Sequence, residues 1–346
     1  MILDADLTGR TVLVLGAAHA ARRAVRRYAH AGAAVRTVTA PSELTGVAGT
    51  EVAGFDLGVD LVAAVADGQD WAPVLERLRG RALVVAEPAA APGGQIVLVG
   101  GGPGVEELLT VAARRALREA DVVLYDRLAP WQNLAALTHG AELVDVGKRP
   151  GRHAVPQDQI EALMVDHARA GRTVVRLKGG DPYVFGRGRE ELGAALAAGI
   201  PVSVVPGVTS AVSVPAAADI PVTHREVSHL FTVVSGHAPL SDAEHEHLAG
   251  LGGTIVVLMG VGTLHHLLAG LRRAGLAAST PVAVVERGYR IDQTTTYSTL
   301  GAAAARGTLA GCANPAVVVI GEVVRLGRDC PAEIASAVGV LAGAGA

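Results

Sequence analysis

Aromatic residues are scarce in this sequence, and charged residues are few. Phe, Trp and Tyr make up 3% of the 346 residues and charged residues 18%, whereas hydrophobic residues make up 50%. A mean hydropathy of +0.37 excludes a disordered chain, because disordered chains are polar and rich in charge. Much of the hydrophobic content is alanine and valine, which favours the small-residue packing of an α/β protein over an aromatic-rich β sandwich. A net charge of -3 excludes binding of nucleic acid through bulk positive charge.

The sequence also lacks an uninterrupted hydrophobic run and has only two cysteines. Its longest stretch without a charged residue, 192–218, contains three prolines, so it cannot cross a membrane as one continuous helix. Two aspartates precede the first basic residue, the reverse of a secretory signal. Cys312 and Cys330 are too few for a disulfide framework or a zinc cluster. We therefore expect a cytoplasmic protein without membrane contact and without bound metal.

Lysine is nearly absent, because the chain has 28 arginines and only two lysines, Lys148 and Lys178. An ammonium differs from a guanidinium in shape and acidity, so a lysine in such a sequence either marks a function or persists by chance. Both lysines lie in glycine-rich turns after strand-like runs.

The first ninety residues alternate strand-like and helical patterns, which predicts right-handed crossovers and a parallel sheet. Strands are expected at 11–15, 35–38, 59–65 and 82–85, a helix at 20–31, and a linker at 89–94.

The first strand ends at Gly16 in a turn that resembles a dinucleotide-binding fingerprint. Ala18 stands where the second glycine belongs, and its Cβ impedes the approach of a pyrophosphate. The acidic residue expected after the second strand is absent from 39–41. This pattern favours a Rossmann-like scaffold with little or no nucleotide affinity over an NAD site.

The alternation restarts at residue 95 and predicts two further α/β lobes. Strands are expected at 96–99, 122–125, 142–146, 174–177, 202–205, 230–234, 254–258, 282–285 and 316–320. We expect a degenerate Rossmann-like domain over 1–93, two α/β lobes over 94–328 with a break near 206–221, and a peripheral tail over 329–346.

Three loops carry the residue types of a ligand site. The glycine-rich turn 100–104 follows one strand, and Gly179, Gly180 and Asp181 follow another. Adjacent glycines let a ligand lie on the backbone, and the aspartate can accept a hydroxyl or ammonium group. The segment 206–211 adds hydroxyls. In an open parallel sheet, such loops at carboxyl strand ends form the ligand crevice.

The region from about 94 to about 325 resembles the tetrapyrrole (corrin/porphyrin) methylase family. The motifs that carry the resemblance lie at 100–104, 107–110, 120–128, 146–149, 151–153, 176–188, 220–225, 236–237, 259–260, 286–288 and 314–316. The first ninety residues resemble the front of the dehydrogenase–chelatase domain of siroheme synthases, without the dimerisation and helical parts that follow there.

The resemblance implies two α/β lobes that bind S-adenosylmethionine (SAM) in the cleft between them and release S-adenosylhomocysteine. It implies Asp126 as proton acceptor and Lys148 as proton donor. The implied SAM contacts are Pro103, Gly179, Gly180, Asp181, Val184, Thr209, Ser210, Met259 and Gly288. A basic rim for the carboxylate arms of the substrate is expected from Arg127, Arg149, Arg152, His153, Arg187 and Arg225.

The expected reaction is C-methylation of uroporphyrinogen III to precorrin-2 through precorrin-1, for cobalamin or siroheme, by a homodimer. Val105, Ala217 and Asp219 depart from the family pattern, so a methylase that acts on a later precorrin remains an alternative. A second alternative is a bifunctional siroheme synthase whose N-terminal domain oxidises precorrin-2 with NAD. In a third, that domain is a scaffold or interaction module without catalysis.

Overall fold

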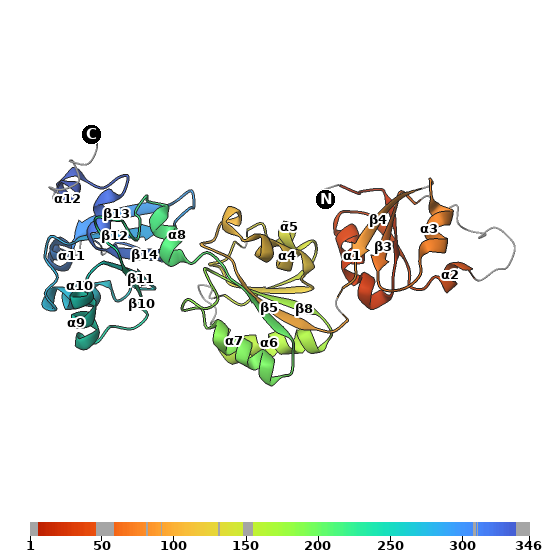
Figure 1. Ribbon diagram of the computed structural model, residues 1–346, viewed down its shortest axis with the longest axis horizontal. Helices are drawn as coiled ribbons and strands as arrows, with labels where there is room; N and C mark the ends of the chain where they lie inside the picture. The colour runs from red at the N-terminus through yellow and green to blue at the C-terminus, as the bar shows by residue number, and fades with distance from the viewer. Residues whose placement is uncertain are drawn as a thin grey trace.

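The computed structural model describes residues 6–45, 59–80, 82–90, 92–130, 132–147, 155–306, 309 and 311–336. These residues form three sheets, each with its own helices, arranged in a row along the long axis of the molecule (Figure 1). We call the three parts the N-terminal unit, the central lobe and the C-terminal lobe. Within the described ranges, no helix is long and apolar enough to cross a membrane. The predicted α/β architecture is confirmed.

The N-terminal unit is built on a parallel sheet of order β2-β1-β3-β4. Helix α1 buries Ala20, Ala21, Ala24 and Tyr28, which share one side of the helix, against one face of this sheet. The elements are β1 (Thr11–Leu15), α1 (Ala18–His30), β2 (Ala34–Val38), α2 (Ser42–Thr45), β3 (Leu61–Ala66), α3 (Ala72–Leu78) and β4 (Leu83–Pro88).

The central lobe has five parallel strands in the order β7-β6-β8-β5-β9. Helices α4 and α5 cover one face and α6 and α7 the other, which explains the continuous hydrophobic runs in its strands (Figure 1). Because the strands are parallel, the loops after them share one edge. The elements are β5 (Gln95–Gly100), η1 (Glu106–Leu108), α4 (Val111–Glu119), β6 (Val122–Tyr125), α5 (Leu134–Thr138), β7 (Glu142–Asp145), α6 (Gln157–Arg169), β8 (Thr173–Lys178), α7 (Gly188–Ala197) and β9 (Val202–Val205).

The C-terminal lobe has a mixed sheet of order β10-β11-β14-β12-β13, in which only β10 and β11 are parallel. The sequence pattern predicts an α/β lobe here and no strand order. Strand β13 was not predicted, and it follows β12 as an antiparallel neighbour after a short connection that leaves no room for a crossover helix. The elements are α8 (Ser210–Ala216), β10 (Phe231–Ser235), α9 (Asp242–Leu251), β11 (Thr254–Leu258), α10 (Leu264–Arg273), β12 (Pro281–Glu286), β13 (Thr294–Thr299), α11 (Leu300–Arg306), β14 (Ala316–Ile320), η2 (Glu322–Leu326) and α12 (Ala332–Ala335).

Two segments are more ordered than the sequence pattern suggested. The stretch 206–221, where the break between the two lobes is predicted, contains α8, which packs against β11 and β14. In the predicted peripheral tail, α12 buries Ile334, whose carbonyl accepts a hydrogen bond from Arg325. The first residues of that tail therefore pack against the C-terminal lobe.

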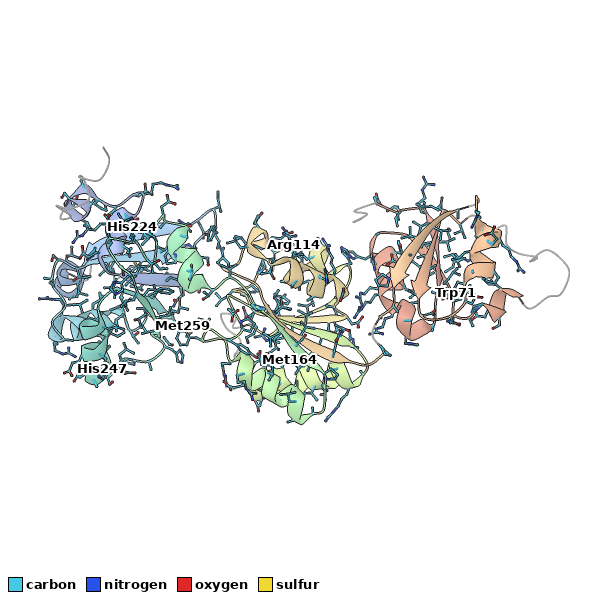
Figure 2. All side chains as sticks on the ribbon, in the orientation of Figure 1. Trp71, Arg114, Met164, His224, His247 and Met259 are labelled. Atoms are coloured by element: carbon cyan, nitrogen blue, oxygen red, sulfur yellow. The ribbon has the colours of Figure 1, made fainter. Side chains whose placement is uncertain are left out.

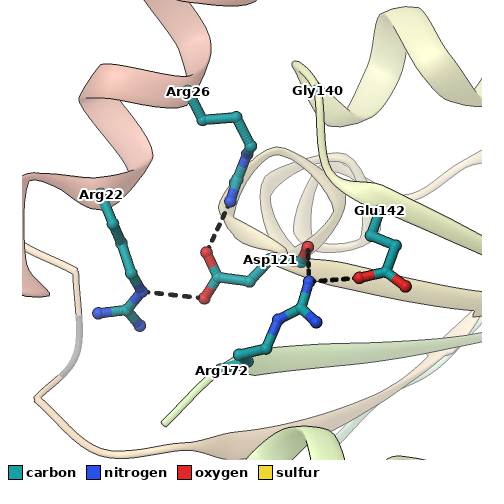
Figure 3. Close-up of a pocket in the computed structure, with 6 residues that line it drawn as sticks. All are labelled: Arg22, Arg26, Asp121, Gly140, Glu142 and Arg172. Atoms are coloured by element: carbon teal, nitrogen blue, oxygen red, sulfur yellow. Dashed lines mark hydrogen bonds and ion pairs between the residues drawn. The ribbon is translucent and has the colours of Figure 1, made fainter. Parts of the chain in front are cut away.

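Helix α1 docks on the central lobe through arginines that converge on Asp121 (Figure 3). Arg26 Nη1 lies 2.7 Å and Arg22 Nε 3.2 Å from the Asp121 carboxylate, which also accepts the amide of Thr173 at 2.8 Å. Arg23 donates to Thr173 Oγ1 at 2.8 Å. Burial alone would raise the pKa of Asp121, but the Thr173 amide and the Arg26 guanidinium outweigh it and lower this pKa. A buried, ionised carboxylate thus joins the two parts.

The docking residues line a pocket of about 390 Å³ beside α1. Each guanidinium in it already faces a carboxylate, because Arg172 Nη2 lies 2.7 Å from Glu142 and the two α1 arginines share Asp121. The pocket lies at the amino ends of β6, β7 and β8, on the edge opposite to the strand ends where open α/β sheets bind ligands. We assign it to docking of the N-terminal unit.

Replacing Asp121 with Asn keeps an acceptor for the Thr173 amide but removes the charge that faces the two arginines. We expect Asp121→Asn to lower the free energy of unfolding by about 2–3 kcal/mol, less than a fully buried pair because both arginines are partly exposed. The control Asp242→Asn breaks an exposed pair with Arg273, so its effect should stay within about 0.5 kcal/mol. Urea unfolding at neutral pH measures both.

The pH dependence gives a second check on Asp121. Because folding lowers its pKa, its contribution to stability is complete above the unfolded value and is lost as pH falls through the folded value. The stability difference between wild type and Asp121→Asn should therefore shrink below about pH 4. A difference that grows on acidification would contradict this account.

Candidate functional site

Three loops cross one another at the carboxyl edge of the central sheet. A Cβ atom on Gly207, after β9, would lie 2.3 Å from the carbonyl oxygen of Gly180, after β8, and 2.6 Å from Gly100 Cα, at the end of β5. Gly180 N donates to Gly102 O at 2.7 Å, and Gly102 N donates to Gly180 O at 3.2 Å. We call these four residues the glycine crossing. Gly180 and Gly207 are partly exposed, so a ligand could reach their backbone directly. Pro103 follows it and is half-buried.

Asp181 stabilises the glycine crossing through hydrogen bonds to backbone amides. Its Oδ1 accepts the amide of Tyr183 at 2.8 Å, and its Oδ2 accepts the amide of Gly207 at 3.0 Å. Each carboxylate oxygen of Asp181 therefore already accepts one backbone amide. A ligand could use only the remaining lone pairs of these oxygens. Gly179, next to it, packs so tightly that a Cβ would lie 2.5 Å from Leu128 Cβ.

Helix α8 begins beside the crossing and belongs to the C-terminal lobe. Thr209 caps this helix by accepting the amide of Ala211 at 3.3 Å. Ser210 N lies 3.7 Å from the position of a Cβ on Gly180. The structure thus brings Thr209 and Ser210 next to Gly180, and all three are among the predicted SAM contacts.

The C-terminal lobe contributes three more predicted residues at this junction. Gly288, after β12, packs on α8, where a Cβ would lie 3.0 Å from Val214 Cγ1. Val184, in the loop after β8, packs against the core of the C-terminal lobe. Met259, after β11, is 45% exposed with a φ of 58°, and Figure 2 places it on the side that faces the central lobe. A positive φ in a non-glycine residue costs free energy and is common at binding sites.

Asp126 lies in the loop after β6, at the same edge of the sheet. One carboxylate oxygen accepts the amide of Leu128 at 3.0 Å, and the other lies 3.6 Å from Arg176 Nη2. The Asp126 side chain is 25% exposed. The carboxylate is therefore accessible from outside and has a buried cation behind it.

Two of the three described arginines of the predicted basic rim already contact carboxylates of the protein. Arg127 Nε lies 3.7 Å from Asp145, whereas Arg187 binds Glu190 with two hydrogen bonds of 2.9 and 2.6 Å. Glu190 raises the pKa of Arg187. Arg225 is exposed in a turn of the C-terminal lobe.

Four predicted site residues, Lys148, Arg149, Arg152 and His153, lie outside the described residues. The residue before them, Gly147, lies beside the Asp126 loop, since its Cβ would be 3.2 Å from Arg127 N. The part of the chain that the structure describes contains no group of three or more His, Cys, Asp or Glu side chains that could hold a metal.

Three buried charges behind this edge were not among the predicted site residues. Arg176 and Lys178 lie on β8 and Glu191 in the first turn of α7, with exposures of 5%, 4% and 0%. Glu191 Oε1 accepts Arg176 Nε at 3.0 Å and Lys178 Nζ at 2.9 Å. Burial and the neighbouring Arg176 lower the pKa of Lys178. Two cations in an otherwise hydrophobic strand are a usable sequence signal, because buried cations require a counter-charge.

The turn after Gly16, which resembles an incomplete dinucleotide-binding fingerprint, is occupied by a carboxylate of the protein itself. Asp67 Oδ2 accepts the amide of Ala17 at 2.6 Å in the turn that leads into α1, where dinucleotide-binding proteins hold a pyrophosphate. Burial alone would raise the pKa of Asp67, but the amides of Ala17 and Gln69 bring it down to about 2. Gly16 has a packing role, since a Cβ there would lie 2.8 Å from Val65 Cβ. A permanent negative charge at this turn opposes phosphate binding.

The segment that contains the crossing is similar to known proteins. The family model for Tetrapyrrole (Corrin/Porphyrin) Methylases matches residues 95–304. An S-adenosyl-L-methionine-dependent uroporphyrinogen III methyltransferase of Methanosarcina barkeri is 47% identical over 237 residues, which are 67% of this chain and 93% of that protein. A siroheme synthase of Gluconacetobacter diazotrophicus is 46% identical over 68% of this chain, but the match spans only 51% of its length.

A solved structure gives the same result for the fold. The crystal structure of the uroporphyrin-III C-methyl transferase of Thermus thermophilus, complexed with S-adenosylhomocysteine, superposes with a TM-score of 0.57 at 41% identity. The superposition covers 67% of this chain and 100% of that chain. The two α/β lobes predicted for the region after residue 93 therefore correspond to a complete known methyltransferase fold.

The glycine crossing makes a prediction about Gly207. Gly207→Ala should lower the free energy of unfolding by about 1–3 kcal/mol, because the new methyl group would overlap backbone atoms of two other loops. The control Gly250→Ala lies within α9, where a Cβ meets nothing within 4 Å. It should be neutral or stabilise by up to about 1 kcal/mol. Urea unfolding compares the two variants, and equal stabilities would disprove the close crossing.

Proposed function

The chain belongs to the tetrapyrrole (corrin/porphyrin) methylase family, and from that premise we propose that it methylates carbon atoms of uroporphyrinogen III with SAM. The product would be precorrin-2, reached through precorrin-1, for cobalamin or siroheme. The observation that carries the proposal is the 47% identity to a uroporphyrinogen III methyltransferase over 93% of its length. The matched region includes the glycine crossing and the Asp126 loop.

The residues around the crossing fit SAM as the methyl donor. A ligand with a charged amino-acid end and a flat adenine needs backbone access and adjacent hydroxyls, which Gly179, Gly180, Thr209 and Ser210 offer together. We assign the contacts to Pro103, Gly179, Gly180, Asp181, Val184, Thr209, Ser210, Met259 and Gly288. Bound SAM would supply an electrophilic methyl group on a sulfonium.

The chain's own residues would then position the substrate and accept or donate protons. A pyrrole carbon is nucleophilic, so holding it in line with the methyl group supplies much of the acceleration. Methylation leaves a cationic ring that must lose a proton, and the accessible Asp126 carboxylate is suited to accept it. We assign Lys148 as the proton donor. Arg127, Arg149, Arg152, His153, Arg187 and Arg225 would bind the substrate carboxylates, with Arg187 exchanging Glu190 for substrate.

We propose that the N-terminal unit, residues 1–93, is a Rossmann-like scaffold without dehydrogenase activity. Its turn into α1 holds the Asp67 carboxylate in place of a phosphate, and its α1 arginines bind the central lobe. The family model begins only at residue 95. We retain 94–328 as the methyltransferase, with its break near 206–221, and 329–346 as a tail.

Two further properties belong to the same proposal. The free thiols of Cys312 and Cys330 are consistent with the reducing cytoplasm. The methyltransferase part is expected to form a homodimer, so light scattering should give about twice the chain mass of 35.1 kDa.

Ligand binding distinguishes the two alternatives for the N-terminal unit. Isothermal titration of the full chain should detect S-adenosylhomocysteine binding and no NAD⁺ binding, because Asp67 opposes the pyrophosphate. Gly180→Val should abolish S-adenosylhomocysteine binding, since its φ of 67° disfavours a branched side chain. Micromolar NAD⁺ binding that Gly16→Val removes would instead favour the bifunctional synthase.

The activity test combines the proposed reaction with the role of Lys148. Purified protein, SAM and uroporphyrinogen III, kept anaerobic and reducing, should yield a product heavier by two methyl groups. Lys148→Arg should lower turnover by roughly 10²-fold or more, because a guanidinium does not deprotonate in proteins. S-adenosylhomocysteine affinity should remain near wild type. Near-normal turnover with a raised substrate requirement would make Lys148 an electrostatic anchor.

A further inference from the structure

The ion cluster behind Asp126 depends on one carboxylate that is fully buried. Glu191 Oε1 accepts hydrogen bonds from Arg176 at 3.0 Å, Lys178 at 2.9 Å and Gln157 at 3.3 Å. Its side-chain exposure is 0%. Glu191 Oε2 is buried and has no hydrogen-bond partner among the described residues. Such a carboxylate is costly to bury, so it must serve the cations that it contacts.

A loop closure brings Glu191 beneath β8. The chain leaves β8 through the glycine crossing and returns so that Gly188 N donates to Pro182 O at 3.0 Å. A Cβ on Gly188 would lie 2.5 Å from that same oxygen, so only glycine allows this return. Helix α7 starts at Gly188, which places Glu191 in its first turn. The loop that builds the proposed SAM site thus also positions the buried carboxylate.

Arg176 connects Glu191 to Asp126. Its guanidinium is fixed on three sides, by Glu191 at 3.0 Å and by the carbonyls of Leu177 at 2.9 Å and Leu124 at 3.4 Å. The remaining Nη2 points to Asp126 Oδ2 at 3.6 Å, a charge contact longer than a hydrogen bond. Arg176 cannot move toward or away from Asp126 without giving up buried hydrogen bonds. Asp126 therefore faces a cation whose position Glu191 determines.

By formal charge, the buried part of the cluster has one cation more than it has carboxylates. Arg176 and Lys178 carry two positive charges and Glu191 one negative charge, so the buried part has a net charge of one positive. Asp126, the partly exposed member, supplies the missing negative charge at the surface. The cluster thus sets a fixed cation beside Asp126 and orients one of its two carboxylate oxygens.

Resting on the proposed function, we propose that Glu191 and Arg176 are positioning residues for the methylation. They would act through Asp126, holding its carboxylate oriented toward the substrate, without touching substrate or SAM themselves. Lys178 would be the second cation that Glu191 neutralises. Neither Glu191 nor Arg176 belongs to the acid/base pair assigned above.

A double-mutant cycle tests this proposal, with the single-turnover methylation rate at saturating SAM as readout. Glu191→Gln keeps the shape but removes the charge, and Arg176→Lys keeps the charge but cannot span Glu191 and Asp126. Each should lower the rate by about 10- to 100-fold, the scale of a small misplacement of a reacting group. In the Asp126→Asn background, each should change the rate less than twofold, because coupled residues are not additive. Affinity for S-adenosylhomocysteine should change less than threefold.

A matched control and a second variant keep the outcome clear. Glu142→Gln removes a carboxylate from an ion pair of the same lobe, at the amino edge of the sheet, and should leave the rate unchanged. If Glu191→Gln does not fold, Arg176→Lys carries the test. Equal rate losses with and without Asp126 would overturn the positioning role and leave the cluster purely structural. If the wild type does not methylate uroporphyrinogen III, the proposed function falls, and this inference with it.

Discussion

The close approach of three backbones at the glycine crossing is the constraint on which the proposed site depends. Gly100, Gly180 and Gly207 lie at the carboxyl ends of three neighbouring strands of one sheet, and no side chain fits at Gly100 or Gly207. Asp181 closes the arrangement by accepting the Gly207 amide. The same contact sends the chain from β9 into α8 and the C-terminal lobe. One packing requirement therefore creates the backbone surface and brings the second lobe to it.

The crossing also explains why charged residues lie inside the central lobe. The loop after β8 must return tightly, and its closure at Gly188 puts the first turn of α7 under the strand. Glu191 then meets Arg176 and Lys178 where solvent is excluded. Buried ion pairs add little net stability, because desolvation offsets their attraction. Their position directly behind Asp126 favours a role in orienting that carboxylate over a role in stability.

Much of the fold could be predicted because the parallel strands are buried on both faces. Strands β6 and β11 have the predicted bounds, since continuous aliphatic runs between polar turns leave little ambiguity. Strand β13 was not predicted, because Thr294–Thr299 is polar and lies at a sheet edge, where no hydrophobic run is required. The glycine loops could be predicted from composition. The Glu191 cluster could not, because it depends on a loop closure that brings together residues 13 and 15 positions apart.

The chain contains two strand–glycine–helix turns that look alike in sequence, at Gly16 and at Gly100, and the structure separates them. At Gly16 the backbone amide that follows is occupied by Asp67, and the arginine face of α1 is used to hold Asp121. At Gly100 the amides of the next two residues donate to backbone carbonyls, those of Lys178 at the end of β8 and Gly180 in the loop after it. A glycine after a strand signals close backbone approach in both turns. A carboxylate approaches at Gly16 and neighbouring backbone approaches at Gly100, and residues far away in sequence decide which. The motif alone therefore does not assign the function.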